Sequence, residues 1–247
     1  MRGTIGMKRI LITRSVEDNA RWAEDLRAAD LQPVELPCIR CEPIPESAAL
    51  LALELARCDW LALTSRRGAR AVAALAPGGL PDGVSVAAVG AASADAARAL
   101  LGHCDLVAPE QSGHSLAVAL AECASERILL AGAQDGLPDL RDGLTTRGVE
   151  CVLVPVYRTY PAVPSGTRAQ VEADAVFLAS PSAVEGLMAQ TDLPATVAVV
   201  TLGPATSAAA QAAGLTVAAE AAGRDLPAMI HAWRSLDAAH QPPDCRS

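Results

Sequence analysis

Short apolar segments alternate with longer segments of helical periodicity along nearly the whole chain of 247 residues. A short run that is apolar throughout suits a strand buried on both faces, and the longer segments carry the apolar stripe of a helix that covers a sheet. Strands and helices in regular alternation are typical of parallel α/β domains. The expected strands are Arg9–Thr13, Gln32–Leu36, Trp60–Thr64, Val84–Val89, Leu106–Ala108, Arg127–Ala131, Glu150–Val154, Ala175–Ala179, Thr196–Thr201 and Val217–Ala219.

The chain then repeats this pattern. Three pairs of segments match in the same order at offsets of 118, 115 and 113 residues, and small loop deletions account for the drift. The first offset also relates Pro37 to Pro155 and Arg40 to Arg158. Three successive βα units in one order predict an internal duplication, and therefore two similar domains. The matching pairs are Arg9–Ile12 with Arg127–Leu130, Asp59–Ser65 with Asp174–Ser180, and Gly90–Ser93 with Gly203–Thr206.

Small hydroxyl residues follow several of the expected strands at their carboxyl ends. In parallel α/β sheets this edge binds ligands, because loops there lead into helix N-termini. Each such corner offers free backbone N–H groups, a partial positive charge and a hydroxyl that can bind a carboxylate or a phosphate. Nearby arginines, Arg14, Arg66 and Arg67, could pair with carboxylates. The corners are Thr13–Ser15, Thr64–Arg67, Gly90–Ser93, Ser180–Ser182 and Gly203–Thr206.

Each of these residues also has an ordinary structural interpretation. Serine and threonine cap helices in all proteins, and a lone arginine is typical of a solvated surface. Five corners of the same chemistry nevertheless favour a site for a polyanion. The chain has no G-x-G-x-x-G, no G-x-x-x-x-G-K-[ST] and no G-x-S-x-G, so the motifs of dinucleotide, nucleoside triphosphate and hydrolase sites are missing.

Charge and cysteine content narrow the class of protein further. A formal net charge of -8 argues against a general nucleic-acid binder, which needs a basic face. Seven cysteines are an odd number, and Met1–Lys8 has no apolar signal segment, so a reduced, cytoplasmic setting is expected. Cys38 and Cys41 form the only C-x-x-C, without the further ligands of a zinc site, so no metal and no cofactor are expected. The uncharged stretch 193–219 is interrupted by Gly203-Pro204 and reads as strand, turn and helix of a soluble protein.

Seven segments in this order resemble the uroporphyrinogen-III synthase family, and together they cover nearly the whole chain. The last three are the most specific of them. The segments are ILITR (Ile10–Arg14), LALTSRR (Leu61–Arg67), AVG with a hydroxyl three residues on (Ala88–Ser93), VAPE (Val107–Glu110), VPVYRT (Val154–Thr159), FLASPSAV (Phe177–Val184) and LGPATSAA (Leu202–Ala209).

The resemblance implies an exchange of segments that periodicity alone does not reveal. In the family the chain crosses between domains twice, so that the first βα unit joins the last third of the sequence. Here the discontinuous domain would be residues 1–37 and 159–247, and the other domain residues 38–158. The implied fold is a pair of pseudo-symmetric parallel-sheet α/β domains from an internal duplication, joined by a two-stranded hinge near 37–43 and 155–161, with the site in the cleft between them.

The resemblance also implies a reaction and its residues. The family takes hydroxymethylbilane, a linear tetrapyrrole polycarboxylate, inverts its terminal pyrrole through a spiro intermediate and closes the ring with loss of water, without cofactor or metal. Tyr157 matches the family's tyrosine and is the expected proton donor to the departing hydroxyl. The positions expected to bind substrate are Arg14, Thr64, Ser65, Arg66, Ser93, Ser180, Ser182 and Thr206. The expected partner is this small molecule, with no nucleic acid and no membrane, and the protein is expected to be a monomer.

Two other functions share these sequence features. A two-lobed module that closes on a small anion and only signals would show the same duplication and strand-end hydroxyls, but it would need neither turnover nor a tyrosine at the hinge. A flavodoxin-like nucleotide-binding regulator is the third possibility, and a thermal shift with FMN or NAD would reveal it.

Overall fold

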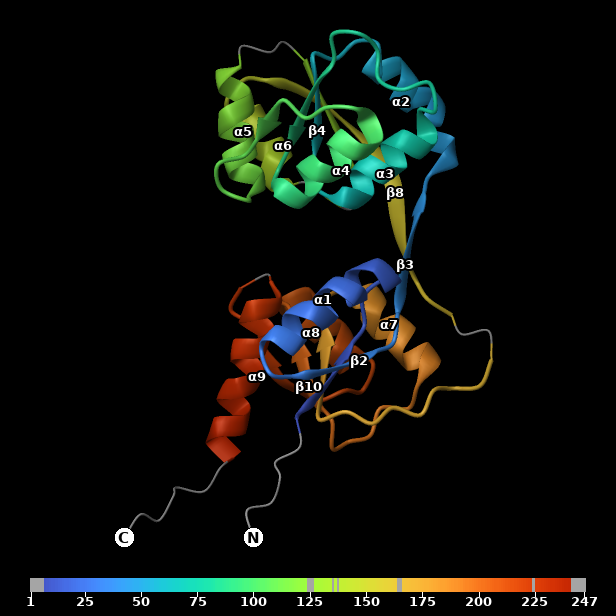
Figure 1. Cartoon of the computed structure of the whole chain (residues 1–247), viewed down its shortest axis with the longest axis vertical. Helices are drawn as coiled ribbons and strands as arrows, with labels where there is room; N and C mark the ends of the chain where they lie inside the picture. The colour runs from blue at the N-terminus through green and yellow to red at the C-terminus, as the bar shows by residue number, and fades with distance from the viewer. Residues whose placement is uncertain are drawn as a thin grey trace. The chain divides into compact units, whose positions relative to one another are not determined.

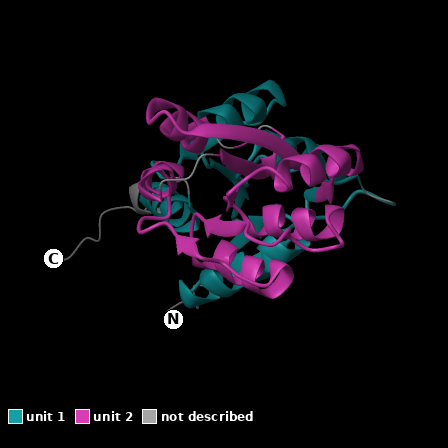
Figure 2. Cartoon of the chain, turned by 90° about the horizontal axis from the view of Figure 1, so that it is seen from above, with its two compact units in different colours: residues 1–40, 160–247 teal, residues 41–159 magenta. Residues whose placement is uncertain are grey.

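A computed structural model describes residues 7–123, 127–134, 136, 138–163, 166–223 and 225–240, without the side chains of 237–240. The described residues form two compact units (Figure 2). Unit 1 contains those of 1–40 and 160–247, and unit 2 contains those of 41–159. These divisions fall a few residues after positions 37 and 158, at which the family resemblance puts the domain boundaries.

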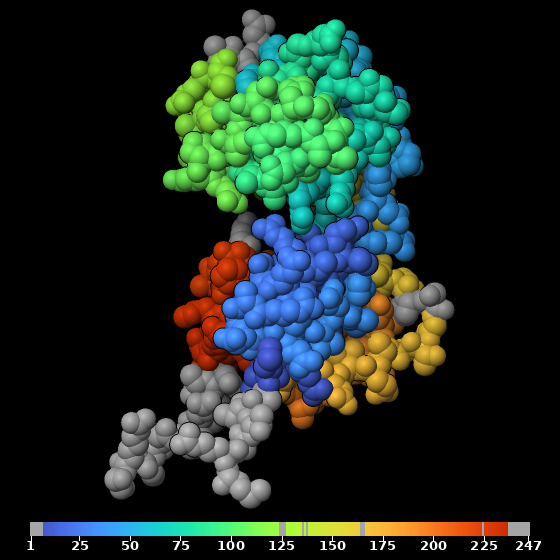
Figure 3. All heavy atoms as spheres, viewed as in Figure 1, coloured from blue at the N-terminus to red at the C-terminus, as the bar shows by residue number. Residues whose placement is uncertain are grey.

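Unit 1 is built on a parallel five-stranded sheet with the order β11-β10-β9-β1-β2 (Figure 1). Its core lies on both faces of the sheet. Leu26 of α1 and Met229 of α9 pack on one face, and Leu187 of α7 and Ala210 of α8 pack on the other. Figure 3 shows α1 in blue beside α9 in red on this unit. The elements are β1 (Arg9–Ile12), α1 (Val16–Ala28), β2 (Gln32–Glu35), β9 (Ala175–Leu178), α7 (Pro181–Gln190), β10 (Ala198–Thr201), α8 (Pro204–Ala212), β11 (Val217–Glu220) and α9 (Leu226–His240).

Unit 2 is built on a six-stranded sheet with the order β3-β8-β7-β4-β5-β6. Helices α2, α3 and α4 contribute to the core on one face, and α5 and α6 to the core on the other. The elements are β3 (Ile39–Pro43), the 3-10 turn η1 (Pro45–Ser47), α2 (Ala48–Leu55), β4 (Trp60–Leu63), α3 (Arg66–Leu75), β5 (Ser85–Ala88), α4 (Ala91–Leu101), β6 (Leu106–Val107), α5 (Gly113–Glu122), β7 (Arg127–Ala133), α6 (Pro138–Thr146) and β8 (Glu150–Pro161). β3 and β8 cross the division between the units, so that Ile39, Arg40, Tyr160 and Pro161 belong to unit 1.

The two sheets have the same strand order once the repeat is taken into account. Under the offsets seen in the sequence, β11-β10-β9-β1-β2 corresponds to β6-β5-β4-β7-β8, and β3 is an additional edge strand. The order is the flavodoxin-like 2-1-3-4-5 arrangement. The predicted α/β fold with two parallel sheets is therefore confirmed for the five strands that the units share. The equal strand order agrees with an internal duplication.

Individual hydrogen bonds repeat as well. The backbone N–H of Arg9 donates to the Asp174 carboxylate at 2.7 Å, and that of Arg127 donates to Asp59 at 2.9 Å. Each bond joins the first residue of a central strand to the aspartate that precedes its neighbour, so each fixes the register of a central pair. Asp59 and Asp174, which are equivalent in the sequence repeat, therefore also make equivalent hydrogen bonds in the fold.

All ten strands expected from the apolar pattern are present. The pattern did not predict β3, because its sequence IRCEP has a buried residue at one end and is otherwise polar or proline, but β3 lies where the family resemblance implies a hinge strand, near 37–43. β8 continues to Pro161, seven residues beyond the end that the pattern predicts at Val154, and its last residues lie where the resemblance implies the second hinge strand, near 155–161. The stretch 193–219 contains β10 and α8, as expected. In the part of the chain that the structure describes, no helix is long and apolar enough to cross a membrane.

Helix α7 lies unusually close to the backbone that leads from β2 to β3. A Cβ atom placed on Gly186 would overlap the carbonyl oxygen of Cys38, which belongs to the chain rather than to a flexible side chain. One turn later, the Gln190 amide donates to the carbonyl oxygen of Pro37 at 2.9 Å. Glycine at 186 therefore permits a close contact that holds α7 against the start of the crossing segment.

Gly186→Ala is expected to lower the free energy of unfolding by about 2 to 4 kcal/mol, because helix and strand must separate to admit the methyl group. Alanine would otherwise favour a helix interior. Urea unfolding followed by circular dichroism measures the loss. Gly78→Ala is the matched control, since a Cβ there meets no atom within 4 Å, and it should change stability by less than about 0.5 kcal/mol. Equal stability of the two variants would contradict the close contact.

Candidate functional site

In each unit the carboxyl-terminal edge of the sheet is the expected place for a ligand. A sheet of order 2-1-3-4-5 has a switch point where successive crossovers leave to opposite sides, and ligands bind outside the strand ends there. In unit 1 this point lies between β1 and β9, and in unit 2 between β7 and β4. Chain segments that continue from three of these strands, β1, β9 and β4, supply six of the nine residues predicted from the sequence.

Tyr157 lies on β8 of unit 2, next to a bulge. Pairing with β7 proceeds residue by residue from Glu150 to Pro155 and then skips one position, so that Tyr157 rather than Val156 is paired with Ala133. Side chains of a strand alternate between the faces of a sheet, and one extra residue turns all later ones over. The bulge therefore brings Tyr157 to the α3 face of the sheet, where Val154 and Val156 also lie.

The side chain of Tyr157 is 8% exposed, and its ring belongs to the apolar cluster that includes Ala69 and Val72 of α3. Its hydroxyl oxygen lies 3.2 Å from Oγ of Ser65, the residue that precedes α3. The structure thus brings together two of the residues that the sequence predicts for the site. A phenol fixed by packing and held at its hydroxyl can donate a proton with little reorganisation.

Ser65 is also the N-cap of α3, because its Oγ accepts a hydrogen bond from the backbone N–H of Gly68 at 3.0 Å. The first turn of α3 carries Arg66 and Arg67 and no acidic residue. Two cations at the positive end of a helix dipole disfavour the helix slightly and make the local potential attractive to anions. A Cβ on Gly68 would lie 3.1 Å from the Ala131 carbonyl oxygen, so the helix start sits tightly against the end of β7.

The next corner of unit 2 is the start of α4. Gly90 is its N-cap, and Ser93 lies one turn into the helix with 6% of its surface exposed. Thr64, between β4 and Ser65, is half-buried. The side chain of Gln111 lies beside Gly90, within 3.1 Å of where a Cβ would be. Nothing in the sequence singled out Gln111, because a loop glutamine carries no motif.

In unit 1, Arg14 is held by its own helix. Its guanidinium lies 3.1 Å from the Asp18 carboxylate and 5.4 Å from the ring centroid of Trp22, and its backbone N–H donates to Oδ1 of Asn19 at 2.8 Å. Asn19 is fully buried and also donates to the Ile12 carbonyl oxygen, so it ties the loop after β1 to α1. No sequence motif indicates Asn19, because its role is to hold the loop in place.

The other predicted residues of unit 1 lie at the starts of α7 and α8. Ser180 is the N-cap of α7 and accepts from the N–H of Ala183 at 3.3 Å, and Ser182 is half-buried in the same turn. Thr206, in the first turn of α8, is 5% exposed. Next to it, Ser207 bonds to Thr201 at 2.7 Å and donates to the Glu220 carboxylate, which ties α8 to β10 and β11.

The repeat places an apolar residue in unit 1 where unit 2 has its tyrosine. The 118-residue offset relates Tyr157 to Ile39, which is 3% exposed and belongs to the cluster with Ala183 and Val184 of α7. Helix α7 is the counterpart of α3, and Ser180 is the counterpart of Ser65. Both units therefore have a serine cap in this position, but only unit 2 has a hydroxyl group opposite it.

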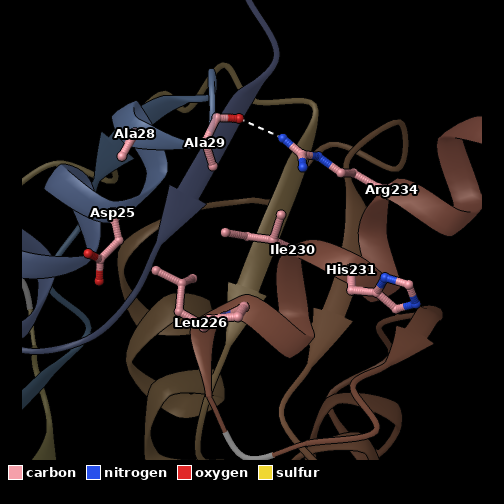
Figure 4. Close-up of a pocket in the computed structure, with 8 residues that line it drawn as sticks. Asp25, Ala28, Ala29, Leu226, Ile230, His231 and Arg234 are labelled. Carbon is pink, nitrogen blue, oxygen red and sulfur yellow. Dashed lines mark hydrogen bonds between the residues drawn. The ribbon is translucent and has the colours of Figure 1, made fainter.

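Two hollows of unit 1 lie away from the strand ends that carry these residues. One, of about 480 Å³, lies between α1 and α9, where Arg234 donates to the Ala29 carbonyl oxygen at 2.6 Å (Figure 4). The other, of about 560 Å³, is lined by Arg9, Asp174 and Ala198 at the amino ends of strands. Because parallel sheets bind ligands at their carboxyl ends, neither hollow is the candidate site. Among the described residues, no three His, Cys, Asp or Glu side chains are grouped so as to hold a metal ion.

Comparison with known proteins gives a family match over most of the chain. The family described as uroporphyrinogen-III synthase HemD matches residues 20–231. The porphyrin biosynthesis protein HemD of Ruminiclostridium josui is 31% identical over 160 residues, which cover 61% of this chain and 32% of that protein. The chain thus spans about a third of the length of this relative.

Solved structures with a similar fold include two from bacteria. The uroporphyrinogen-III synthetase of Helicobacter pylori has a TM-score of 0.56 and 15% identity, covering 93% of this chain and 100% of that one. A mutant uroporphyrinogen III synthase of Thermus thermophilus has a TM-score of 0.51 and 18% identity, covering 94% and 100%. At these identities the likeness is one of fold.

The cysteines of the C-x-x-C pair have separate surroundings. Cys38 is fully buried and its thiol donates to the Leu36 carbonyl oxygen, whereas Cys41 lies 3.4 Å from the Thr159 hydroxyl. Burial raises the pKa of Cys38 to about 12, and burial is also the main reason why the pKa of Cys58 is raised to about 11. Only the thiolate is a strong nucleophile, so both thiols should be unreactive near neutral pH.

Iodoacetamide at pH 8 is expected to alkylate the exposed Cys123 long before Cys38 or Cys58 in the folded protein. The raised pKa values leave very little thiolate at the two buried positions, and the fold excludes the reagent. Peptide mass spectrometry over a time course gives the order, and protein unfolded in urea provides the control in which all sites react. Labelling of Cys38 as fast as Cys123 in folded protein would contradict its burial.

Proposed function

Because the chain belongs to the uroporphyrinogen-III synthase family, we propose that it converts hydroxymethylbilane into uroporphyrinogen III, with inversion of the terminal pyrrole ring and release of water. The observation that carries this proposal is the Tyr157 hydroxyl, held 3.2 Å from Ser65 at the start of α3. It lies next to a switch point, in the part of the sheet where this fold class binds ligands.

The proposed reaction requires one proton donor and groups that stabilise charge. The bond between the hydroxymethyl carbon and its oxygen breaks with the electrons on oxygen, and the pyrrole nitrogen supplies electrons to the carbon. In our proposal the Tyr157 hydroxyl gives its proton to the departing oxygen, which leaves as water. The carbon then bonds to the already substituted α-carbon of the terminal ring, which gives the spiro intermediate. The bond from that α-carbon to its original bridging carbon breaks, and the bridging carbon bonds to the free α-carbon of the same ring, so that the ring is inverted. The proton that this second α-carbon loses when the pyrrole is restored returns to the phenolate. Donation at a fixed position lowers the barrier to departure.

The carboxylates of the substrate are proposed to bind at the helix starts. In unit 2 the backbone N–H groups of α3 and α4, with Thr64, Ser65, Arg66 and Ser93, supply donors and positive potential. In unit 1 the corresponding groups are Ser180 and Ser182 at α7 and Thr206 at α8. Arg14 is part of the proposal too, although a carboxylate would compete there with Asp18.

The cellular location and the oligomeric state of the protein are also part of the proposal. We propose that it works in the cytoplasm as a monomer. The six described cysteines carry free thiols, as is usual in a reducing compartment. Sedimentation equilibrium at micromolar concentration measures the oligomeric state directly.

Uroporphyrinogen III is expected from purified protein and fresh hydroxymethylbilane, without added metal, nucleotide or flavin and without loss in a chelator. The sequence has neither metal-ligand spacing nor a nucleotide loop. Left alone in water, the substrate cyclises without inversion, so the type III isomer reports catalysis and the type I isomer is the background. Chromatography of the oxidised products separates the isomers. Type I isomer alone, at the uncatalysed rate, would favour a binding module over an enzyme.

Tyr157→Phe is expected to slow turnover by about 10-fold to 1000-fold, the range for loss of one proton donor, while substrate binding changes much less. Phenylalanine keeps the ring in the cluster with Ala69 and Val72, so folding should be preserved. Tyr160→Phe is the matched control, because it removes the other tyrosine hydroxyl of the chain. If Tyr157→Phe and Tyr160→Phe turn over at the same rate, Tyr157 is not the proton donor, although the protein is still an enzyme.

Thr206→Ala or Ser180→Ala alone is expected to weaken substrate binding by only about 1 to 2 kcal/mol, since each removes one hydrogen bond to a charged group. Titration of the Tyr157→Phe protein with hydroxymethylbilane measures the affinity. Ser112→Ala is a control for loss of a helix cap, because Ser112 caps α5 in the way that Ser180 caps α7. Complete loss of binding from either change in a folded protein would show that the corners do not share the carboxylates.

A further inference from the structure

The hydroxyls of Ser65 and Tyr157 form a pair whose geometry is determined from both sides. On the side of Tyr157, the bulge in β8 selects the face of the sheet, and the apolar cluster fixes the ring. With 8% of its surface exposed, the tyrosine retains little freedom except rotation of its O–H bond. The contact at the hydroxyl therefore decides where the proton points.

On the side of Ser65, helix capping fixes the position of Oγ and determines which hydrogen bonds the hydroxyl group can make. A serine hydroxyl has one hydrogen and two lone pairs. One lone pair accepts the Gly68 N–H at 3.0 Å, which holds Oγ at the start of α3. The hydrogen can then be donated across the 3.2 Å to the Tyr157 oxygen. If Ser65 donates in this way, the tyrosine's own hydrogen is directed away from Ser65 and is free for a ligand.

The charge at this helix start favours the same arrangement. The N-terminal N–H groups of α3 carry partial positive charge. An oxygen that gives up its proton here gains a hydrogen bond from Ser65 and lies in a positive potential. An apolar residue in place of Ser65 would supply no such hydrogen bond.

We propose that Ser65 is a positioning residue for Tyr157: it donates a hydrogen bond to the tyrosine oxygen, turns the tyrosine proton toward the substrate, and stabilises the phenolate left after proton transfer. This assignment replaces the carboxylate-binding role that the sequence and the proposed function give to Ser65, because its single hydrogen cannot be donated to both oxygens. It rests on the proposed function, since it needs Tyr157 to donate a proton. Unit 1 gives an internal comparison, because its serine cap, Ser180, has Ile39 in the equivalent position.

The chain has two tyrosines, so a Tyr160→Phe background leaves Tyr157 as the sole tyrosine. Tyrosine labelled with 13C at the carbon that bears the hydroxyl then gives one NMR signal, which reports the hydrogen bond without any substrate. In this background we would compare Ser65→Ala, Ser65→Gly and Ser65→Thr. Glycine is a well-tolerated N-cap and threonine retains the hydroxyl, so the cap and the donor can be varied separately. Ser112→Ala is the control for loss of an equivalent serine cap, on α5.

The alanine and glycine variants are expected to shift the Tyr157 signal and to lower kcat about 10-fold, with KM changed less than about 2-fold, as for one lost hydrogen bond in the transition state. Ser65→Thr should retain the signal and most of kcat, and Ser112→Ala should leave both unchanged. An unmoved signal with unchanged kcat in the glycine variant would overturn the proposal. A raised KM with unchanged kcat would also overturn it and return Ser65 to carboxylate binding.

The experiment distinguishes failure of the proposed function from failure of the positioning role of Ser65. If the Tyr160→Phe protein forms no type III isomer, there is no reaction for Ser65 to support, and its positioning role falls with the proposed function. A signal shift in the glycine variant would then establish the hydrogen bond as a structural contact only.

Discussion

The register of the two central strands in each sheet is the constraint on which the rest of the molecule depends. An aspartate carboxylate receives the first N–H of the neighbouring strand in both units, from Arg9 to Asp174 and from Arg127 to Asp59. A slip by one residue would exchange the two faces of a strand and displace its end along the edge. Because the pairs are held in register, the carboxyl ends of β1 and β9, and of β7 and β4, finish together. The capping serines that follow β9 and β4 take their positions from that alignment.

In our proposal the same side chains serve stability and chemistry at these helix starts. Ser65 and Ser180 are both N-caps, an arrangement that contributes about 1 kcal/mol to a helix and needs no ligand to explain it. What sets Ser65 apart is the phenol opposite it and the arginines beside it. A cap thus becomes part of a site when its second hydrogen-bonding direction is occupied by a reactive group, whereas the Ser180 cap has a hydrocarbon neighbour in the equivalent position.

The strand pattern and the duplication could be predicted from the sequence because buried parallel strands are short, apolar and β-branched, and because the repeat preserves their order. β3 could not be predicted from this pattern, since an edge strand with charges and a proline does not show it, and only the family resemblance implied a hinge strand near 37–43. The bulge before Tyr157 depends on pairing between distant strands, which no local sequence encodes. For the same reason the sequence placed Tyr157 and Ser65 in one site without indicating that they touch. Arg14 was expected to bind a substrate carboxylate, and its ion pair with Asp18 across the start of α1 was not predicted, because no motif indicates it. The exchange of segments between units came from the family resemblance and not from periodicity.

The two repeats differ in side-chain chemistry at one equivalent position. Ile39 packs against α7, whereas Tyr157 presents a hydroxyl group to the start of α3. Divergence after the duplication has therefore made the two units chemically unequal although their strand order is the same. The duplicated fold is symmetric in its backbone and asymmetric in its chemistry.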